Sequence, residues 1–223
     1  VTVPRALVQG VVEEAIALGV TAFVIITAGY GETGAEGRAL EAKLRATIRA
    51  AGARMVGPNC MGVINTDAAV SLNATFSPTP AVAGSVGFVS QSGALGVAIL
   101  NVAAQLGIGL TQFVSMGNKA DVSGNDLVEY WENDPATKVM CMYLESFGNP
   151  RRFTEIAKRV TRKKPILIVK SGRTAEGARA ASSHTGAMAG TDVTVSAFLD
   201  QCGVLRADTI DELFDVARAL DRC

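Results

Sequence analysis

An alternation of short apolar runs with amphipathic segments constrains the fold more than any other feature of the chain. Five runs have the length and composition of buried strands: residues 86–90, 109–117, 139–146, 165–172 and 204–207. Helical patterns lie between and after them, at residues 93–106, 124–133, 150–162, 189–202 and 209–221. Apolar runs separated by helices indicate parallel strands covered on both faces. The sequence therefore predicts an α/β fold whose second part is a flavodoxin-like, doubly wound parallel-sheet domain.

The first part of the chain shows the same alternation over fewer elements. Helical and strand-like patterns take turns at residues 5–19, 21–27, 32–52 and 53–59. The chain starts on "VTVP", which has the pattern of a strand end, so we expect further βα units upstream and part of a doubly wound parallel sheet here. The alternation then lapses, and a stretch rich in Pro and Gly is typical of a linker. We expect two domains, residues 1–80 and 84–223.

The composition argues against several classes of function. Lysine plus arginine and aspartate plus glutamate number 21 each, so no net field favours nucleic acid or an anionic membrane. No apolar run reaches the roughly 18 residues of a membrane span. The four cysteines are widely spaced and accompanied by one histidine, which predicts neither a metal site nor a disulfide framework. These features favour a globular enzyme domain in a reducing compartment, the cytoplasm.

The loops after the strands are the expected place for a binding site, because ligands of open parallel sheets bind beyond the carboxyl ends of the strands. In "SQSGALG", Ser90, Ser92, Gly93 and Ala94 form a turn that opens a helix. Free amides at a helix N-terminus, aided by serine hydroxyls, predict a phosphate-binding site. A simple serine N-cap has the same sequence, and both interpretations stay open.

A second glycine-rich loop follows the strand-like run at residues 21–27. Gly29, Gly31 and Gly34 match the pattern GxGxxG. The pattern permits a dinucleotide site, but no acidic residue ends the next strand to bind a ribose hydroxyl. Ordinary glycine turns are the favoured interpretation.

Three further polar side chains lie near the predicted strand ends or in the loops beyond them. Glu145 ends the run at 139–146, where a carboxylate is either solvated or paired with an imidazole. Lys119 could meet phosphate or cover the sheet edge. His184 is the single histidine and lies in a long loop of small residues. From the residues alone, it is either a reagent or an incidental surface imidazole.

Together these loops carry a family resemblance. The chain contains, in this order, the segments "GPNCMGVIN", "SQSGALG", "VSMGNKADV", "YLES" and "KSGRTAEGARAASSHTGAMAG". In this order and spacing they resemble the NDP-forming acyl-CoA synthetases, which include the succinyl-CoA synthetase α subunit and the ADP-forming acetyl-CoA synthetases. The resemblance covers essentially the whole chain. It implies that residues 1–80 are the C-terminal part of a Rossmann-like CoA-binding domain and that residues 84–223 are a succinyl-CoA-ligase-type domain.

The resemblance also implies a reaction. Acyl-CoA, phosphate and ADP interconvert with a carboxylic acid, CoA and ATP, through an acyl phosphate and then a phosphohistidine. His184 would be phosphorylated and Glu145 would orient it, since a carboxylate fixes the tautomer of a neighbouring imidazole. The SQSGALG turn would hold the phosphoryl group at a helix N-terminus. Asn59 and Cys60 would lie beside the thiol end of CoA.

Cofactors and partners follow from the same resemblance. Nothing in the chain resembles an ATP-grasp nucleotide domain, and the sequence has no P-loop. ADP or ATP with Mg²⁺ would therefore be bound by an ATP-grasp subunit or fused domain, and the fragment alone is expected to be catalytically incomplete. The expected ligands are CoA and a small carboxylic acid or acyl-CoA. A homo-oligomer is compatible with this assignment.

Two alternatives share the fold. The same pair of domains serves as a CoA-sensing regulatory module fused to a protein acetyltransferase, and such relatives commonly replace the phosphorylated histidine. The presence of His184 favours the enzyme. A purely structural subunit that binds CoA or an assembly partner would keep the fold without the phosphohistidine.

Overall fold

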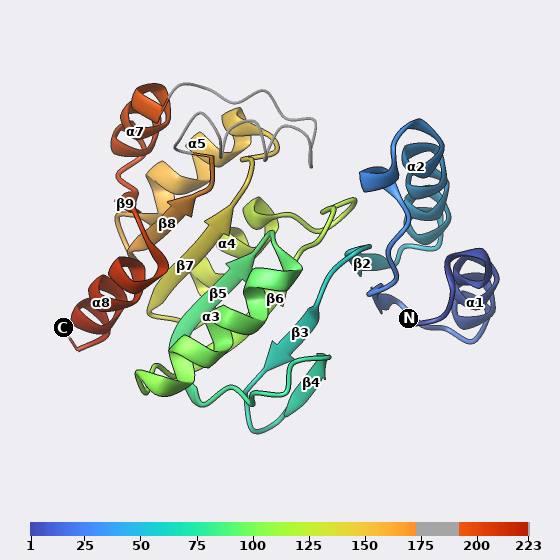
Figure 1. Ribbon diagram of the computed structural model, residues 1–223, viewed down its shortest axis with the longest axis horizontal. Helices are drawn as coiled ribbons and strands as arrows, with labels where there is room; N and C mark the ends of the chain where they lie inside the picture. The colour runs from blue at the N-terminus through green and yellow to red at the C-terminus, as the bar shows by residue number, and fades with distance from the viewer. Residues whose placement is uncertain (173–191, 223) are drawn as a thin grey trace.

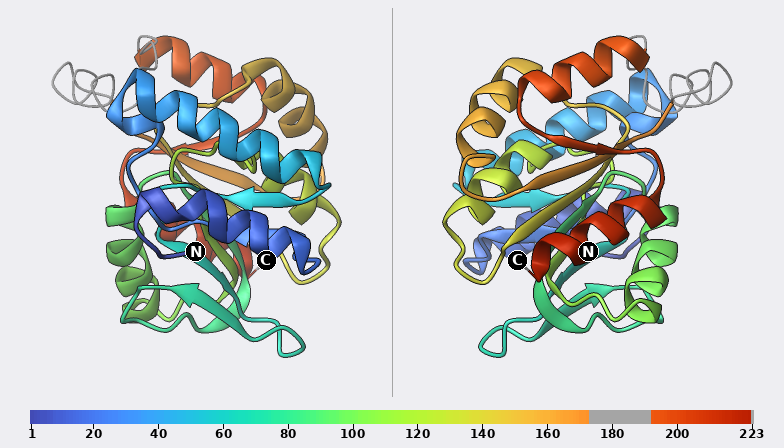
Figure 2. Two further views of the ribbon diagram at one scale, coloured as in Figure 1. Left: turned by 90° about the vertical axis from the view of Figure 1, so that its right-hand side faces the viewer. Right: turned by 90° about the vertical axis from the view of Figure 1, so that its left-hand side faces the viewer.

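The computed structural model describes residues 1–172 and 192–222 (Figure 1). A small N-terminal unit contains two helices, a 3-10 turn and a two-stranded parallel sheet. In chain order these elements are α1 (Arg5–Ala17), β1 (Ala22–Val24), η1 (Gly31–Thr33), α2 (Ala35–Ala50) and β2 (Arg54–Val56). Both helices lie on the outer side of the small sheet, away from the larger domain (Figure 1, Figure 2).

The small unit has a core of its own. Val8 of α1 and Leu44 and Ile48 of α2 pack on Phe23 and Met55, which are the buried residues of the two strands. The spacing of the helical residues puts one apolar face toward the sheet. Residues 1–4, expected to end a strand, are not assigned to one. The terminal residue nevertheless pairs beside β1, because its amino group donates to the carbonyl of residue 24 at 2.6 Å.

The larger domain contains one seven-stranded sheet. Its strands are β3 (Gly62–Asn65), β4 (Leu72–Thr75), β5 (Ala83–Ser90), β6 (Leu110–Ser115), β7 (Val139–Leu144), β8 (Ile166–Lys170) and β9 (Leu205–Ala207). Its helices are α3 (Gly93–Gln105), α4 (Gly124–Asn133), α5 (Pro150–Val160), α7 (Asp192–Gln201) and α8 (Ile210–Asp221). None of the helices in the described ranges is long and apolar enough to cross a membrane.

The strand order confirms the predicted flavodoxin-like topology. The sheet runs β4-β3-β6-β5-β7-β8-β9, and the five strands from β5 to β9 pair in parallel. Numbered from β5, these five strands have the order 2-1-3-4-5, which defines the flavodoxin-like doubly wound sheet. The order reverses beside β5, so the topological switch point lies at the carboxyl end of this strand.

Alternating side chains along the strands fill two cores. In β7, Val139 and Cys141 pack with α3 and α8 on one face, whereas Met140 and Met142 pack with α4, α5 and α7 on the other. This alternation follows from the two-residue period of a strand. Because both faces are covered, the strands read as continuous apolar runs in the sequence.

Polar caps set where several helices begin. Ser123 and Asp126 form a capping box at the start of α4, where Asp126 Oδ2 accepts the Ser123 N–H at 2.8 Å. Asn149 Oδ1 accepts the N–H of Arg152 at 3.1 Å, and Pro150 occupies the first position of α5. Such caps satisfy amides that have no partner inside the helix.

The hairpin of β3 and β4 was not predicted from the sequence. β3 pairs antiparallel with both β4 and β6, so the hairpin extends the larger sheet at its edge. Sheet membership therefore changes at residue 62, whereas the expected domain division lies between residues 80 and 84. β4 is the outermost strand and largely exposed, which explains why no apolar run marks it.

The loop between β6 and α4 of the larger domain makes backbone hydrogen bonds to the small unit. The N–H groups of Asn118 and Ala120 donate to the carbonyls of Pro58 (2.9 Å) and Gly57 (3.2 Å). Asp121 belongs to the same loop, and its carboxylate is buried. Its side chain is ion-paired with the guanidinium groups of residues 49 and 54. These contacts bring the segment after β2 against the segment after β6.

Candidate functional site

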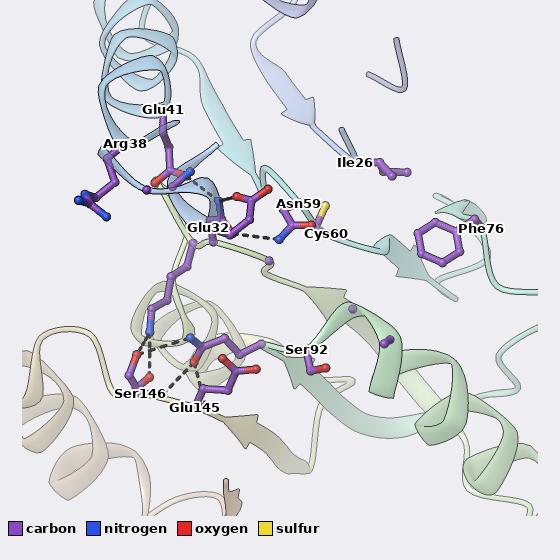
Figure 3. A pocket seen from close by; sticks show the side chains of 18 residues that line it. Ile26, Glu32, Arg38, Glu41, Asn59, Cys60, Phe76, Ser92, Glu145 and Ser146 are labelled. Atoms are coloured by element: carbon purple, nitrogen blue, oxygen red, sulfur yellow. Dashed lines mark hydrogen bonds between the residues drawn. The ribbon is translucent and has the colours of Figure 1, made fainter. Parts of the chain in front are cut away.

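A cavity of about 800 Å³ lies between the small unit and the carboxyl ends of β5, β6 and β7. Figure 3 shows Glu32, Arg38 and Glu41 on the side of the small unit and Ser92, Glu145 and Ser146 on the opposite side. The small unit contributes Ile26, Gly31, Glu32, Gly34, Arg38, Glu41, Asn59 and Cys60. The larger domain contributes Phe76, Gln91, Ser92, Gly93, Ala94, Gly117, Asn118, Lys119, Glu145 and Ser146.

Most residues singled out from the sequence meet in this one cavity. Asn59 and Cys60 line it from one side, and the turn from residue 92 to 94 lines it with Glu145 from the other. Ser90 does not line it, because this residue is buried at the end of β5. His184 lies outside the described residues, which end at Gly172 just beyond β8 and resume at α7.

The SQSGALG turn is built as a helix cap. Ser90 Oγ donates to the carbonyl of Ser92 at 2.7 Å, and Ser92 Oγ accepts the N–H of Leu95 at 3.4 Å. The serine-cap interpretation is therefore realised. It leaves the first amides of α3, those of Gly93 and Ala94, at the wall of the cavity. The positive end of the helix dipole at this point favours an anion.

Gln91 fixes the segment that carries Glu145. This side chain is buried, and its Oε1 accepts the N–H groups of Glu145 and Ser146, both at 3.0 Å. The two amides belong to the chain just after β7, so one side chain ties the ends of two neighbouring strands together. Sequence reasoning did not single out Gln91. A long polar side chain between two serines directly after a buried strand was the available signal.

Lys119 places an ammonium group beside Glu145. Its Nζ donates to Ser146 O at 2.9 Å and to Ser146 Oγ at 2.5 Å. Burial lowers the pKa of Lys119 to about 8, while attraction to Glu145 opposes the shift. The side chain therefore carries its charge at neutral pH.

Cys60 is a buried thiol rather than an activated one. Its Sγ donates to the carbonyl of Ile25 at 3.3 Å, and burial raises the pKa of the Cys60 thiol to about 11. A neutral thiol is a poor nucleophile. The neighbouring Asn59 has φ +57°, and its amide group donates to Asn118 Oδ1 at 3.2 Å. Cys60 therefore shapes the cavity without supplying a reactive thiolate.

Two carboxylates occupy the glycine-rich loop of the small unit. Glu32 accepts the N–H groups of Gly29 and Tyr30, and Glu41 accepts that of Gly31 at 3.0 Å. Burial acts to raise the pKa of Glu32, but hydrogen bonds from Asn118 and from these amides outweigh it and lower the pKa. The amides that a pyrophosphate would need are thus already bonded to carboxylates. The geometry therefore favours ordinary glycine turns and argues against a dinucleotide site.

The arrangement suits the binding of a small oxyanion next to an ionisable pair. One wall offers helix amides, the carboxylate of Glu145 and the ammonium of Lys119. The other wall offers Asn59, Cys60 and the carboxylates of Glu32 and Glu41. Both carboxylates accept hydrogen bonds from the side-chain amide of Asn118. Among the residues with described positions, no group of three His, Cys, Asp or Glu side chains is placed to hold a metal ion.

Comparisons with known proteins agree with the sequence motifs. A family model described as a CoA binding domain matches residues 1–66, and one described as the succinyl-CoA ligase like flavodoxin domain matches residues 83–220. The chain is 47% identical over 99% of its length to the alpha subunit of an ADP-forming acetate–CoA ligase from Pyrococcus furiosus, of which it covers 47%. It is 44% identical over 97% of its length to an ADP-forming acetate–CoA ligase from Methanocaldococcus jannaschii, of which it covers 30%.

A solved structure extends the likeness to three dimensions. The acetyl-coenzyme A synthetase 1 of Ca. Korarchaeum cryptofilum, in complex with phosphate and ADP, superposes over 98% of this chain with a TM-score of 0.92 and 41% identity. The chain covers 47% of that protein and so spans less than half of each of these relatives. All three are ligases or synthetases, and the acetyltransferase-linked alternative finds no support among them. With a family model matched across most of the larger domain and another across the small unit, the chain belongs to the family of succinyl-CoA ligase-like flavodoxin domains, preceded by a CoA-binding domain.

Proposed function

We propose that the chain is part of an ADP-forming acid–CoA ligase. The enzyme interconverts acyl-CoA, phosphate and ADP with a small carboxylic acid, CoA and ATP. The observation that carries the proposal is the composition of the cavity: the SQSGALG turn and Glu145 line it from one domain, and Asn59 and Cys60 line it from the other. One wall suits a phosphoryl group and the other suits the thiol end of CoA. The names of the relatives, acetate–CoA ligases that form ADP, support the same chemistry.

In the first step, an oxygen of inorganic phosphate attacks the carbonyl carbon of the thioester. The carbon–sulfur bond breaks, the proton of hydrogen phosphate passes to the leaving sulfur, and CoA and an acyl phosphate form. The amides at the N-terminus of α3 stabilise the charge on the phosphate oxygens, because preorganised donors at a helix end need no reorganisation during the reaction.

In the second step, a ring nitrogen of His184 attacks phosphorus. The bond between phosphorus and the carboxyl oxygen breaks, and the carboxylate leaves. Glu145 accepts the N–H of the other ring nitrogen, which fixes the tautomer and stabilises the positive charge that develops. The role of His184 rests on its sequence motif, since the residue lies outside the described ranges. The location of Glu145 at the cavity supports its part in the pair.

In the third step, the phosphoryl group passes from His184 to the β-phosphate of ADP as the phosphorus–nitrogen bond breaks. By the family resemblance, an ATP-grasp subunit or fused domain would bind the nucleotide with Mg²⁺, and the ion would supply positive charge to the phosphate oxygens. We place the enzyme in the cytoplasm. Cys60, Cys141 and Cys202 are free thiols, in keeping with a reducing compartment.

Phosphorylation from ATP tests the proposal. The full-length protein, reconstituted with its ATP-grasp part, is incubated with γ-³²P-ATP, and the label on the protein is measured after acid and after base treatment. Label that is labile in acid and stable in base is expected on the wild type and not on His184→Ala. Glu145→Gln is expected to label at least tenfold more slowly, in the range of general acid–base effects.

The control for Glu145→Gln is Glu155→Gln, which changes an exposed carboxylate on α5. This variant is expected to label like the wild type. Absence of phosphohistidine on the wild type, with a nucleotide-competent partner present, would overturn the proposed function.

A further inference from the structure

Lys119 is a charged residue of the cavity to which the proposed function assigns no task. It belongs to the loop between β6 and α4 and lines the cavity near Ser146. Its backbone has φ +50°, in the left-handed region that lysine rarely adopts. The loop is fixed just before it, because the N–H of Asn118 donates to the carbonyl of Pro58 at 2.9 Å. The fold therefore holds Lys119 at this point against its own conformational preference.

The ammonium group has a defined position. Its Nζ donates to Ser146 O at 2.9 Å and to Ser146 Oγ at 2.5 Å. Ser146 is held in turn, since its N–H donates to Oε1 of the buried Gln91 at 3.0 Å. An ammonium has three N–H donors, and within the described ranges Ser146 accepts two. One donor is left for a ligand in the cavity.

The surroundings of this ammonium favour an anion. The N-terminus of α3 lines the same cavity, with the first-turn amides that a helix leaves without partners inside the helix and the positive end of its dipole. The charged groups that act on Lys119 are Glu145 and Lys170, from the ends of β7 and β8. In the proposed mechanism Glu145 also pairs with the imidazole, so its negative charge is shared and does not fully balance the positive charge of Lys119. A small oxyanion bound between the end of the helix and the ammonium group would supply the remaining negative charge.

We propose that Lys119 contacts the reacting oxyanion, either inorganic phosphate or the carboxylate of the acid. The inference rests on the proposed function, because it adds a catalytic residue to the same site. The competing role is a positioning one, in which Lys119 only holds Ser146 and thereby the segment of Glu145. The two roles differ in which kinetic constant changes when the charge is removed.

The proton affinity of Lys119 gives the proposal a pH signature. Burial lowers the pKa of Lys119 to about 8, with the attraction of Glu145 opposing the shift. Burial also lowers the pKa of Lys170, the other basic group that faces it. The ammonium loses its proton as pH rises through about 8. Affinity for the oxyanion is therefore expected to fall between pH 7 and pH 9.

The experiment measures KM for phosphate in the acyl-CoA-consuming direction and KM for the acid in the reverse direction. The proteins are the full-length wild type with its ATP-grasp part, Lys119→Gln, Lys119→Arg and the control Lys138→Gln. Lys138 is exposed and precedes β7 at the opposite end of the sheet. Loss of a charged hydrogen bond is expected to raise one of these KM values about 10-fold to 100-fold in Lys119→Gln. Lys119→Arg should recover part of the loss, and Lys138→Gln should match the wild type.

The direction with the raised KM identifies the oxyanion. A rise for phosphate alone assigns phosphate, and a rise for the acid alone assigns the carboxylate. Unchanged KM values in both directions overturn the proposal, and a fall in kcat alone assigns Lys119 to positioning and overturns it as well. Calorimetric titration with inorganic phosphate provides a second measurement on folded protein. An inactive wild type would instead count against the proposed function itself, so the two failures are distinguishable.

Discussion

Gly117 packs its backbone against the segment after β2, and replacing it by alanine should loosen the contact between the two units. A Cβ at this position would lie 2.2 Å from Pro58 O and 2.4 Å from Asn59 O. Both are backbone atoms and cannot rotate away. Gly117 also has φ +54°, in the left-handed region, where an alanine costs about 1 kcal/mol. Gly117→Ala must therefore push the loop after β6 away from the segment after β2.

The size of the effect follows from the contacts that this movement breaks. The N–H groups of Asn118 and Ala120 donate to the carbonyls of Pro58 and Gly57, and each bond contributes about 1 kcal/mol net. With the backbone cost, Gly117→Ala should lower the free energy of unfolding by about 3 kcal/mol. Gly107 provides the matched control. It has φ +66°, but a Cβ there meets nothing within 4 Å, so Gly107→Ala should cost about 1 kcal/mol.

Urea unfolding of the full-length protein, followed by circular dichroism, measures both differences. The same variants are compared for CoA affinity, because the displaced segment carries Asn59 and Cys60. Gly117→Ala should weaken CoA binding, and Gly107→Ala should leave it unchanged. Equal destabilisation of the two variants, within about 0.5 kcal/mol, would refute the steric argument, since both share the backbone cost and differ only in the clash.

Two further predictions concern the cavity walls. Burial raises the pKa of the Cys60 thiol to about 11, so the thiol is neutral at pH 7.5. Iodoacetamide should therefore alkylate it much more slowly in the native protein than after unfolding. The rate in the native protein should rise as the pH approaches 10, because more of the thiol is then ionised. Peptide mass spectrometry follows the reaction, and equal native and unfolded rates would contradict the burial. Gln91→Leu leaves two amides without their acceptor and should lower the free energy of unfolding by about 2–6 kcal/mol, at about 1–3 kcal/mol for each. Gln91→Glu keeps an acceptor oxygen and should lower the free energy of unfolding by a smaller amount. If the Leu and Glu variants were equally stable in thermal unfolding, these two hydrogen bonds would not contribute to stability as argued.

The larger domain could be predicted well because local and long-range preferences agree in it. Residues 124–133 were expected to be helical, and α4 spans Gly124–Asn133. A serine cap precedes this helix and a proline follows soon after it, so its ends are set by nearby residues. The apolar runs of β5 to β8 are continuous because both sheet faces are covered. A parallel strand that is covered on both faces appears in the sequence as a continuous apolar run.

The hairpin of β3 and β4 left no such mark. Its pairing with β6 joins residues 63–65 to residues 112–114, so the partner lies far along the chain. β4 has one neighbour and exposed or half-buried side chains, and its sequence resembles that of a loop. Edge strands of this kind are defined by the strand they pair with, not by their own residues.

The candidate site divides in the same way. Glu145 and the SQSGALG turn could be singled out because they follow buried strands, and strand ends of a parallel sheet meet at one edge. Glu32 and Glu41 could not, since their shared partner Asn118 is 86 and 77 residues away. A carboxylate can be seen in the sequence, but the distant side-chain amide that donates to it cannot be identified there. His184, the residue on which the mechanism depends most, stays a prediction from its motif.

The hairpin has a consequence for any attempt to cut the protein in two. A shortened chain that starts at residue 84, where the linker ends, would lack β3 and β4 and would bare the outer edge of β6. The unpaired backbone groups of an apolar strand in that state invite pairing between molecules and aggregation. Residues 62–75 thus cover an edge of the larger sheet that would otherwise be open to pairing with a second molecule.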